Sequence, residues 1–337
     1  MTRLHMLFFS LPAVLLLTAC GGGGGATAPV ASAPAAAPTM AQRAAAATST
    51  AQDNANCTAD QPFYWEIGDV TQRLASGSIN SPADGSTPVY TASTVMNVAS
   101  ASKWIYAAYV VQKRGGVLST ADVKFLNFNS GYVSFSTCLP GQTVDACVQY
   151  QNNGVYTAAA DGLFSYGGGH MEKHADLLGL GPLDNAGLAT EIQSQIGSDV
   201  AIAYSQPQLA GGVVTDADAY ALFLRKMLDG TLLIGGMLGT HAVCTNPVTC
   251  PTATTLNTPV PDTESWQYSL GHWVEDDPTV GDGAFSSAGT FGFYPWIDAT
   301  KTWYGILARR TSASNSGYAS AECGRMIRKA WVSGVAQ

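Results

Sequence analysis

The fold of this chain is decided by the run Asn97-Val98-Ala99-Ser100-Ala101-Ser102-Lys103-Trp104-Ile105-Tyr106-Ala107-Ala108-Tyr109. Apolar residues continue to Val111 and Gly115-Gly116 follow, so the pattern predicts a mostly buried helix that opens near Ser100 and stops at the glycines. Ser100 and Lys103 are three residues apart and therefore share one face of this helix. A desolvated lysine amine beside a serine hydroxyl can take its proton and make the serine a nucleophile.

The Ser100–Lys103 pair has a second interpretation, in which Ser100 only caps the helix and Lys103 points to solvent. The apolar residues on both sides of Lys103 favour burial instead. A serine at the N-terminus of a buried helix also meets backbone N–H groups and the positive end of the helix dipole, which stabilise developing negative charge. Ser100 and Lys103 are therefore candidate catalytic residues.

Two later segments carry matching chemistry. The first is Asp161-Gly162-Leu163-Phe164-Ser165-Tyr166-Gly167-Gly168-Gly169-His170, in which the Tyr166 phenol can exchange a proton with a serine or a lysine. The alternative for Tyr166 is a core tyrosine in a glycine-rich turn. The second segment is Phe285-Ser286-Ser287-Ala288-Gly289-Thr290, within the strand-rich C-terminal third.

In this order the motifs resemble those of the serine β-lactamase and penicillin-recognising superfamily. The chain looks most similar to class C β-lactamases and their esterase and amidase relatives, over about 63–332. The resemblance implies that Ser100 is the acylated nucleophile, Lys103 its partner and Tyr166 the phenol that faces it. Gln208-Leu209-Ala210-Gly211-Gly212 resembles the family's Ala-Gly-Gly turn, for which we expect a structural role.

The same resemblance implies an oxyanion hole made by the N–H groups of Ser100 and Thr290. It also implies substrate-binding positions at Gly168, Ser287 and Gly289. Two of these positions depart from the family: Gly168 stands where an asparagine is frequent, and Ser287 stands where a lysine or histidine is usual.

The loss of the cation at Ser287 weakens binding of a substrate carboxylate at that position. We therefore predict a serine hydrolase with a Ser-Lys-Tyr acyl-enzyme mechanism, acting on small ester, amide or peptide-like substrates as an esterase or amidase rather than a β-lactamase. Two alternatives stay open. One is a β-lactamase or D-peptidase, and the other is a non-catalytic binding or sensing lipoprotein that keeps the fold.

The order of the predicted elements favours an α+β fold. A strand pair at 63–69 and 72–79 precedes the central helix, and a mostly helical insertion is expected at about 118–212. Strand patterns return at 267–274, 289–298 and 302–309, with Asp298 to Lys301 as a hairpin turn, and a helix closes the chain at 320–332. This order suits an antiparallel sheet flanked by helices with a helical subdomain, the β-lactamase/transpeptidase-like architecture.

The N-terminus has the pattern of an export signal. Arg3 is followed by an apolar run that is too short to span a bilayer and ends in Leu17-Thr18-Ala19-Cys20. This resembles a lipobox, with residues 1–19 as signal peptide and Cys20 as the lipidated residue. Residues 20–56 have low complexity and are predicted to be a tether for a domain at 57–337. We expect an exported protein, lipid-anchored in the outer membrane of a Gram-negative envelope.

Six cysteines remain after Cys20, an even number that suggests disulfides in an oxidising compartment. Spacing favours local loops closed by Cys138–Cys147 and Cys244–Cys250. Cys57 and Cys323 would then join the two ends of the domain.

The net charge of −8, with only 12% charged residues and no basic stripe, makes nucleic acid an improbable partner. The membrane is expected as a partner only through the lipid anchor, and no cofactor or metal is expected. His170 and His174, with Glu172 between them, offer a metal-site alternative without a third ligand. His272 offers a Ser-His-Asp alternative, but no Gly-x-Ser-x-Gly elbow surrounds Ser100.

Overall fold

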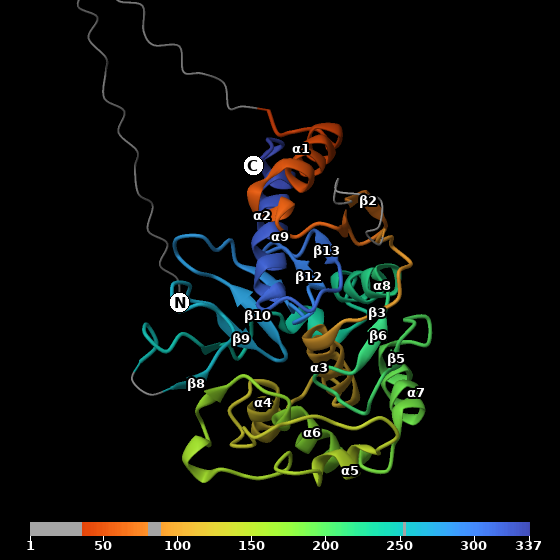
Figure 1. The fold of residues 1–337 in the computed structure, drawn as a ribbon, viewed down its shortest axis with the longest axis vertical. Helices are drawn as coiled ribbons and strands as arrows, with labels where there is room; N and C mark the ends of the chain where they lie inside the picture. Colours follow the sequence, from red (N-terminus) through yellow and green to blue (C-terminus); the bar gives the residue numbers. More distant parts are fainter. Residues whose placement is uncertain (1–35, 80–88, 252–253) are drawn as a thin grey trace, which may run out of the picture. The chain divides into compact units, whose positions relative to one another are not determined.

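The computed structural model describes residues 36–79, 89–251 and 254–337. Its main feature is an antiparallel sheet with the strand order β2-β1-β13-β12-β11-β10-β9-β7 (Figure 1). Its strands are β1 (Phe63–Gly68), β2 (Arg73–Ile79), β7 (Val243–Cys244), β9 (Gln267–Ser269), β10 (His272–Glu275), β11 (Ala284–Ser286), β12 (Tyr294–Ile297) and β13 (Tyr304–Ala308). Because β1 pairs with β13, the two ends of the folded chain build one sheet.

Helices and two smaller sheets complete the α+β fold that the sequence predicted. The small sheets pair β3 (Met96–Asn97), β6 (Val213–Thr215) and β5 (Ala203–Tyr204), and β4 (Phe164–Ser165) with β8 (Thr255–Asn257). The α-helices are α1 (Met40–Asp53), α2 (Ala55–Thr58), α3 (Ser102–Lys113), α4 (Thr120–Leu126), α5 (Val144–Val148), α6 (Gly169–Ala175), α7 (Asn185–Ile196), α8 (Ala217–Leu228) and α9 (Ser316–Ser333). Shorter helical turns are η1 (Ala99–Ala101), η2 (Ala158–Ala160), η3 (Asp176–Leu180) and η4 (Leu233–Met237). The segment predicted as a helical insertion thus holds α4 to α7, short strands and long irregular loops.

Helices α8 and α9 cover opposite faces of the large sheet. On β13, Tyr304 accepts a hydrogen bond from Arg225 of α8. On β12, Tyr294 lies opposite Leu307 and accepts a hydrogen bond from Arg328 of α9. Since Leu307 is three positions from Tyr304, strand alternation puts the two tyrosines on different faces.

The central helix α3 has the burial that its sequence predicted. Its residues from Ser102 to Val111 are buried, and it ends at Lys113, before the paired glycines. This all-round burial explains why the helix is apolar on most sides. It also fixes the position of Ser100, which lies in η1 immediately before α3.

The C-terminal strands differ from the prediction at two places. In the segment 289–298, only Tyr294–Ile297 forms a strand (β12), and Gly289 to Gly292 form a turn in which the Gly292 N–H donates to the Gly289 carbonyl (2.8 Å). The segment 267–274, predicted as one strand, is a hairpin of β9 and β10 that turns at Leu270 (φ +41°) and Gly271 (φ +80°). Two consecutive left-handed residues are the geometry of a tight hairpin turn. The predicted hairpin at Asp298 is confirmed, with the Lys301 N–H donating to the Asp298 carbonyl (2.9 Å).

The expected tether to residue 56 is wrong for its C-terminal part. Helix α1 begins after a capping box of Thr39 and Gln42, buries Ala47 and Ala51, and lies beside α9 (Figure 1). Alanine is the best helix former, and its small side chain allows close packing, so an alanine-rich stretch here is a docked helix rather than a linker. The predicted signal peptide (1–19) and Cys20 lie outside the described residues.

Three disulfides connect the six remaining cysteines as their spacing favoured. The pairs are Cys57–Cys323, Cys138–Cys147 and Cys244–Cys250. The first pair ties α2 to α9 and so joins the N-terminal helices to the last one.

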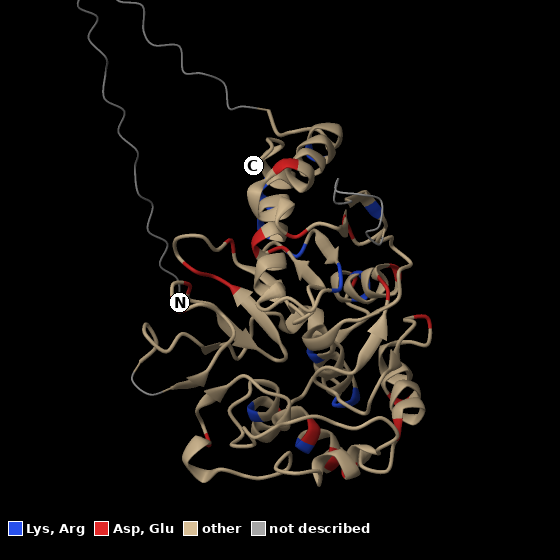
Figure 2. Cartoon of the chain, in the orientation of Figure 1, with Lys and Arg blue, Asp and Glu red and all other residues tan. Residues whose placement is uncertain are grey.

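The described part of the chain has few basic residues, scattered over several helices and strands (Figure 2). None of its helices combines the length and the apolar character that crossing a bilayer requires.

Candidate active site

Ser100 is presented by a strained turn. Ala99, immediately before it, has φ +45°, a left-handed conformation that is unfavourable for alanine. The turn is held from two sides: the Asn97 side chain accepts from the Ala99 N–H (2.7 Å), and the Ser287 hydroxyl donates to the Ser100 carbonyl (3.2 Å). The Ser100 side chain remains partly exposed and can be reached by a substrate.

Lys103 is buried beside Ser100. Only 5% of it is exposed, and its Nζ lies 2.8 Å from the Ser100 Oγ and 2.8 Å from the carbonyl oxygen of Ala210. Burial lowers the pKa of Lys103 to about 7, and the nearby Glu172 carboxyl opposes this shift. A substantial fraction of the amine is therefore neutral near pH 7 and able to accept the serine proton.

Tyr166 closes the group of three that the sequence predicted. The Lys103 Nζ lies 4.8 Å from the centre of the Tyr166 ring, which stacks on Trp273 with centroids 5.2 Å apart. Burial raises the pKa of Tyr166 to about 12, while hydrogen bonding with Ser100 and Trp273 lowers it. The phenol thus keeps its proton at neutral pH, which suits a proton donor and shuttle better than a standing tyrosinate.

Gly289 brings the predicted oxyanion segment against the nucleophile turn. A Cβ at this position would lie 2.2 Å from the carbonyl oxygen of Val98, so only glycine allows this approach. Thr290, the next residue, is exposed and lines the cleft together with Ser100.

The other two positions that the resemblance assigned to substrate have different surroundings. Gly168 lines the cleft, and a Cβ there would lie 2.8 Å from the Phe135 ring, so Phe135 takes the space next to Gly168. Ser287 is 3% exposed and its hydroxyl faces the Ser100 carbonyl. The Ser287 side chain thus supports the turn that holds Ser100, and its contact with a substrate stays a prediction.

Ser100 and Thr290 lie where two hollows meet. The apolar lobe is lined mainly by aromatic and aliphatic side chains: Tyr166, Pro259, Val260, Trp266, Trp273, Ala288 and Tyr318. The polar lobe is lined mainly by hydrogen-bonding groups and one arginine: Asn97, Lys103, Ser205, Gln206, Gln208 and Arg310. A substrate carbonyl at Ser100 can therefore extend an apolar group to one side and a polar group to the other.

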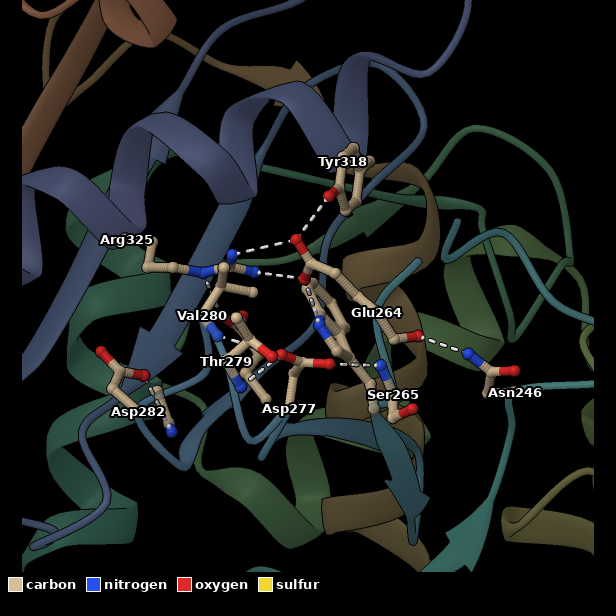
Figure 3. Close-up of polar contacts among 12 residues, drawn as sticks. Asn246, Glu264, Ser265, Asp277, Thr279, Val280, Asp282, Tyr318 and Arg325 are labelled. Atoms are coloured by element: carbon tan, nitrogen blue, oxygen red, sulfur yellow. Dashed lines mark hydrogen bonds and ion pairs between the residues drawn. The ribbon is translucent and has the colours of Figure 1, made fainter. Parts of the chain in front are cut away.

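A buried ionic network fixes the wall of the apolar lobe (Figure 3). Glu264 accepts hydrogen bonds from the Trp266 indole (2.8 Å) and the Tyr318 hydroxyl (2.6 Å), and Arg325 of α9 donates to both of its carboxylate oxygens (3.1 and 2.8 Å). One carboxylate thus holds two aromatic side chains of the lobe. Such anchoring restricts their rotamers before a ligand arrives.

Glu172, which the sequence analysis considered only as a metal ligand, lies behind Lys103. It is fully buried, and its Oε1 accepts from the Ala210 N–H (3.3 Å). Burial raises the pKa of Glu172 to about 8, against the opposing effects of the Ala210 and Leu209 N–H groups and of Lys103. The Ala-Gly-Gly turn thus connects the two buried groups, because Ala210 accepts from the Lys103 amine and donates to the Glu172 carboxyl.

The histidines have hydrogen-bond partners of their own. His170 pairs with Ser130 (2.7 Å) and the Ser165 carbonyl (3.0 Å), and His174 pairs with Tyr106 (3.2 Å) and Asp122 (3.0 Å). These separate partners argue against the metal-site alternative.

A second candidate metal site and the Ser-His-Asp alternative are also excluded, because their atoms already have other partners. The group Cys138, Cys147 and Glu172 has close ligand atoms, but a disulfide removes both thiolates. His272 uses its two ring nitrogens on the backbone of Gly239 (3.1 Å) and Leu270 (3.3 Å), so it does not form a triad with Ser100.

Solved structures of low sequence identity share this architecture. EstCE1, a hydrolase with promiscuous acyltransferase activity, superposes with a TM-score of 0.61 at 11% identity, over 87% of this chain and 99% of EstCE1. The D-amino acid amidase from Ochrobactrum anthropi, complexed with L-phenylalanine, gives 0.58 at 11% identity, over 86% of this chain and 98% of the amidase. A β-lactamase from Mycobacterium bovis gives 0.51 at 11% identity, over 81% and 96%.

The chain has the β-lactamase fold. No known family model matches its sequence, and no curated protein does. Within the β-lactamase fold, the turn before α3 holds Ser100, the first turn of α3 holds Lys103, and the segment before α6 holds Tyr166.

Proposed function

We propose that the protein is a serine hydrolase that cleaves an ester or amide through an acyl-enzyme on Ser100. One observation carries this proposal: the buried Lys103 amine lies 2.8 Å from the Ser100 Oγ. A binding module has no need of a desolvated amine beside a serine, because burying the amine costs free energy that binding alone does not recover.

In the proposed acylation step, the Ser100 Oγ attacks the substrate carbonyl carbon and its proton passes to the neutral Lys103 amine. The oxyanion forms at the N–H groups of Ser100 and Thr290, where each donor contributes roughly 2.7–4 kcal/mol in comparable sites. The bond to the leaving group then breaks, and that group takes the proton from Lys103 through Tyr166. In deacylation, water attacks the acyl carbon and gives a proton to the neutral Lys103 amine. The bond between the acyl carbon and the Ser100 Oγ then breaks, the Oγ takes the proton back from Lys103, and the carboxylic acid leaves.

The ester or amide preference rests on the absence of a cation at Ser287. The residue at this position is a buried serine, so a β-lactam carboxylate would lack the partner that the related β-lactamases supply. The test compares short-chain nitrophenyl esters, small amides and a chromogenic cephalosporin. Strong cephalosporin turnover with little esterase activity would reverse this preference.

The nucleophile itself is tested with a fluorophosphonate probe on the purified protein. We expect covalent labelling at Ser100 and none in Ser100→Ala, with equal circular dichroism spectra for the two proteins. A well-folded wild-type protein that the probe does not label would leave the non-catalytic binding module as the better account.

We also propose that the protein is exported and lipid-anchored through Cys20 in the outer membrane. Three disulfides support an oxidising compartment. Incorporation of a labelled fatty acid in cells, lost in Cys20→Ala, is the expected result. Release of the unprocessed wild-type chain without a lipid would contradict it.

A further inference from the structure

Arg310 adds a positive charge to the polar lobe. It follows β13 and lines the same hollow as Ser100, Lys103 and Thr290. Its side chain is exposed to the lobe's solvent. Basic residues are sparse over the described chain (Figure 2). The described residues that line this lobe include no aspartate or glutamate, and the other basic residue among them is the buried Lys103.

The main chain around Arg310 is fixed. The Tyr90 hydroxyl donates to the Arg310 carbonyl (2.9 Å) and accepts from its N–H (3.2 Å). The Arg310 guanidinium lies over the Phe291 ring, 5.5 Å from its centre, and the next residue, Thr311, donates its N–H to the Phe291 carbonyl (2.9 Å). None of the ion pairs within residues 36–79, 89–251 and 254–337 includes Arg310. The guanidinium is thus placed to receive an anionic ligand group.

The neighbouring arginine shows that this placement is specific to one position. Arg309 turns inward, where its guanidinium binds the Asp60 carboxylate (2.6 Å) and the Ser320 hydroxyl (2.9 Å). Arg310, one residue further along, is exposed and lines the polar lobe. Of these two arginines, only Arg310 can bind a ligand group in the polar lobe.

The position of Tyr166 decides which end of a substrate enters which lobe. Tyr166 lines the apolar lobe, and it is the group that we assign to protonate the leaving group. The leaving group must therefore lie in the apolar lobe. The acyl part is left for the polar lobe, beside Arg310 and the amide side chains of Gln206 and Gln208.

We infer that the preferred substrates are esters or amides whose acyl part carries a free carboxylate bound by Arg310 and whose leaving group is apolar. The inference rests on the proposed function and gives its substrate class: monoesters or monoamides of dicarboxylic acids and related acyl compounds. Guanidinium–carboxylate hydrogen bonds are charge-assisted and can be bidentate, which gives both affinity and orientation. The enzyme would thus bind the carboxylate of its substrate with Arg310. It would not use the position of Ser287, where the β-lactamase superfamily usually has a lysine or histidine.

The test uses matched fluorophosphonates with alkyl chains of increasing length, each made as the ω-carboxylate and as its methyl ester. Since the phosphonate alkyl chain takes the place of the acyl part, the rate of Ser100 labelling reports binding in the polar lobe. We expect the carboxylate probe to label wild-type protein about tenfold faster than its ester at the best chain length. The advantage should shrink in high salt, because Arg310 is exposed.

Two variants distinguish the charge of Arg310 from a change in the net charge of the protein. Arg310→Gln should remove the advantage of the carboxylate probe, so that the two probes label Ser100 at equal rates. Lys329→Gln removes a positive charge from α9 that lines neither lobe, and should leave the tenfold ratio intact.

Equal labelling by both probes at every chain length, or a carboxylate preference that survives in Arg310→Gln, would overturn this inference and leave the serine hydrolase intact. If neither probe labels Ser100 in folded protein, the proposed function falls, and this inference falls with it.

Discussion

Lys103 and Glu172 are both held by the main chain of Ala210. The Ala210 carbonyl accepts from the Lys103 Nζ (2.8 Å), and the Ala210 N–H donates to the Glu172 Oε1 (3.3 Å). The second carboxyl oxygen of Glu172 has no partner among the described residues. Burial disfavours the charged form of both the carboxyl and the amine, because each loses its contact with water. A charge on either group would in turn stabilise the opposite charge on the other.

This arrangement predicts the pH dependence of Glu172 variants. For the wild type, kcat/KM should rise with pH around 7, because burial lowers the pKa of Lys103 to about 7 and only the neutral amine accepts a proton. Negative charge on Glu172 opposes that shift, so Glu172→Gln should move the rising limb to lower pH. The displacement should stay below about one pH unit, because burial raises the pKa of Glu172 to about 8 and much of this carboxyl is neutral near pH 7. Full pH–rate profiles would measure the displacement.

Two further variants distinguish the charge of Glu172 from its packing. Glu172→Ala leaves the Ala210 N–H without its acceptor, and we expect its high-pH rate to fall by about tenfold or more as the turn loosens. Glu322→Gln changes a carboxyl on α9 that lines neither lobe and should keep the wild-type profile. If Glu172→Gln also followed the wild-type profile, Glu172 would have no influence on the Lys103 amine.

The sequence predicts the groups that are near one another in the chain or belong to ordered motifs. Ser100 and Lys103 share a helical turn, so their contact follows from spacing. Tyr166 was predicted from the resemblance of its segment, in the order of the motifs, to the β-lactamase superfamily, and the cysteine pairs were predicted because two of them close short loops. These features are local, or they follow from motif order.

Groups that depend on long-range packing could not be predicted in the same way. Glu172 meets Ala210 only after α6 has folded against a turn far along the chain. For Arg309 and Arg310, sequence does not tell which of two adjacent arginines is buried with Asp60. The alanine-rich helix α1 was missed because its helical propensity was read as low complexity, and its docking on α9 is visible only in three dimensions.

Removing the Tyr166 hydroxyl should slow catalysis without unfolding the protein. In Tyr166→Phe the ring can keep its contacts with Tyr268 and Trp273. The lost proton transfer should lower kcat by roughly 10²–10⁴-fold. Steady-state kinetics and thermal melting together check this, and a variant with near-wild-type kcat would exclude Tyr166 from the proton transfers. The effect should be smaller for a substrate with a good leaving group, such as a nitrophenyl ester, than for an amide.

The close approach at Gly289 should make this position intolerant of any side chain. A Cβ in Gly289→Ala would meet the Val98 carbonyl at 2.2 Å, so the segment must shift and carry Thr290 with it. We expect a loss of about 1–3 kcal/mol in the free energy of unfolding and a larger proportional loss of Ser100 labelling. Gly236→Ala is the matched control, since no atom lies within 4 Å of its Cβ. Equal labelling rates in the two variants would show that Gly289 does not position the oxyanion segment.

The Cys57–Cys323 disulfide should contribute more to stability than the short-loop disulfide Cys244–Cys250. The sequence separations are 266 and 6 residues, and the chain-entropy relation gives about 5.6 kcal/mol for the long loop against about 2.2 for the short one. The double variants Cys57→Ser/Cys323→Ser and Cys244→Ser/Cys250→Ser, unfolded by urea, measure the difference. Neither cysteine of the long-loop pair lines the cleft, so Ser100 labelling at 25 °C should be unchanged in the first variant. Equal stability losses in the two variants would mean that α1 and α2 stay docked on α9 without the covalent link.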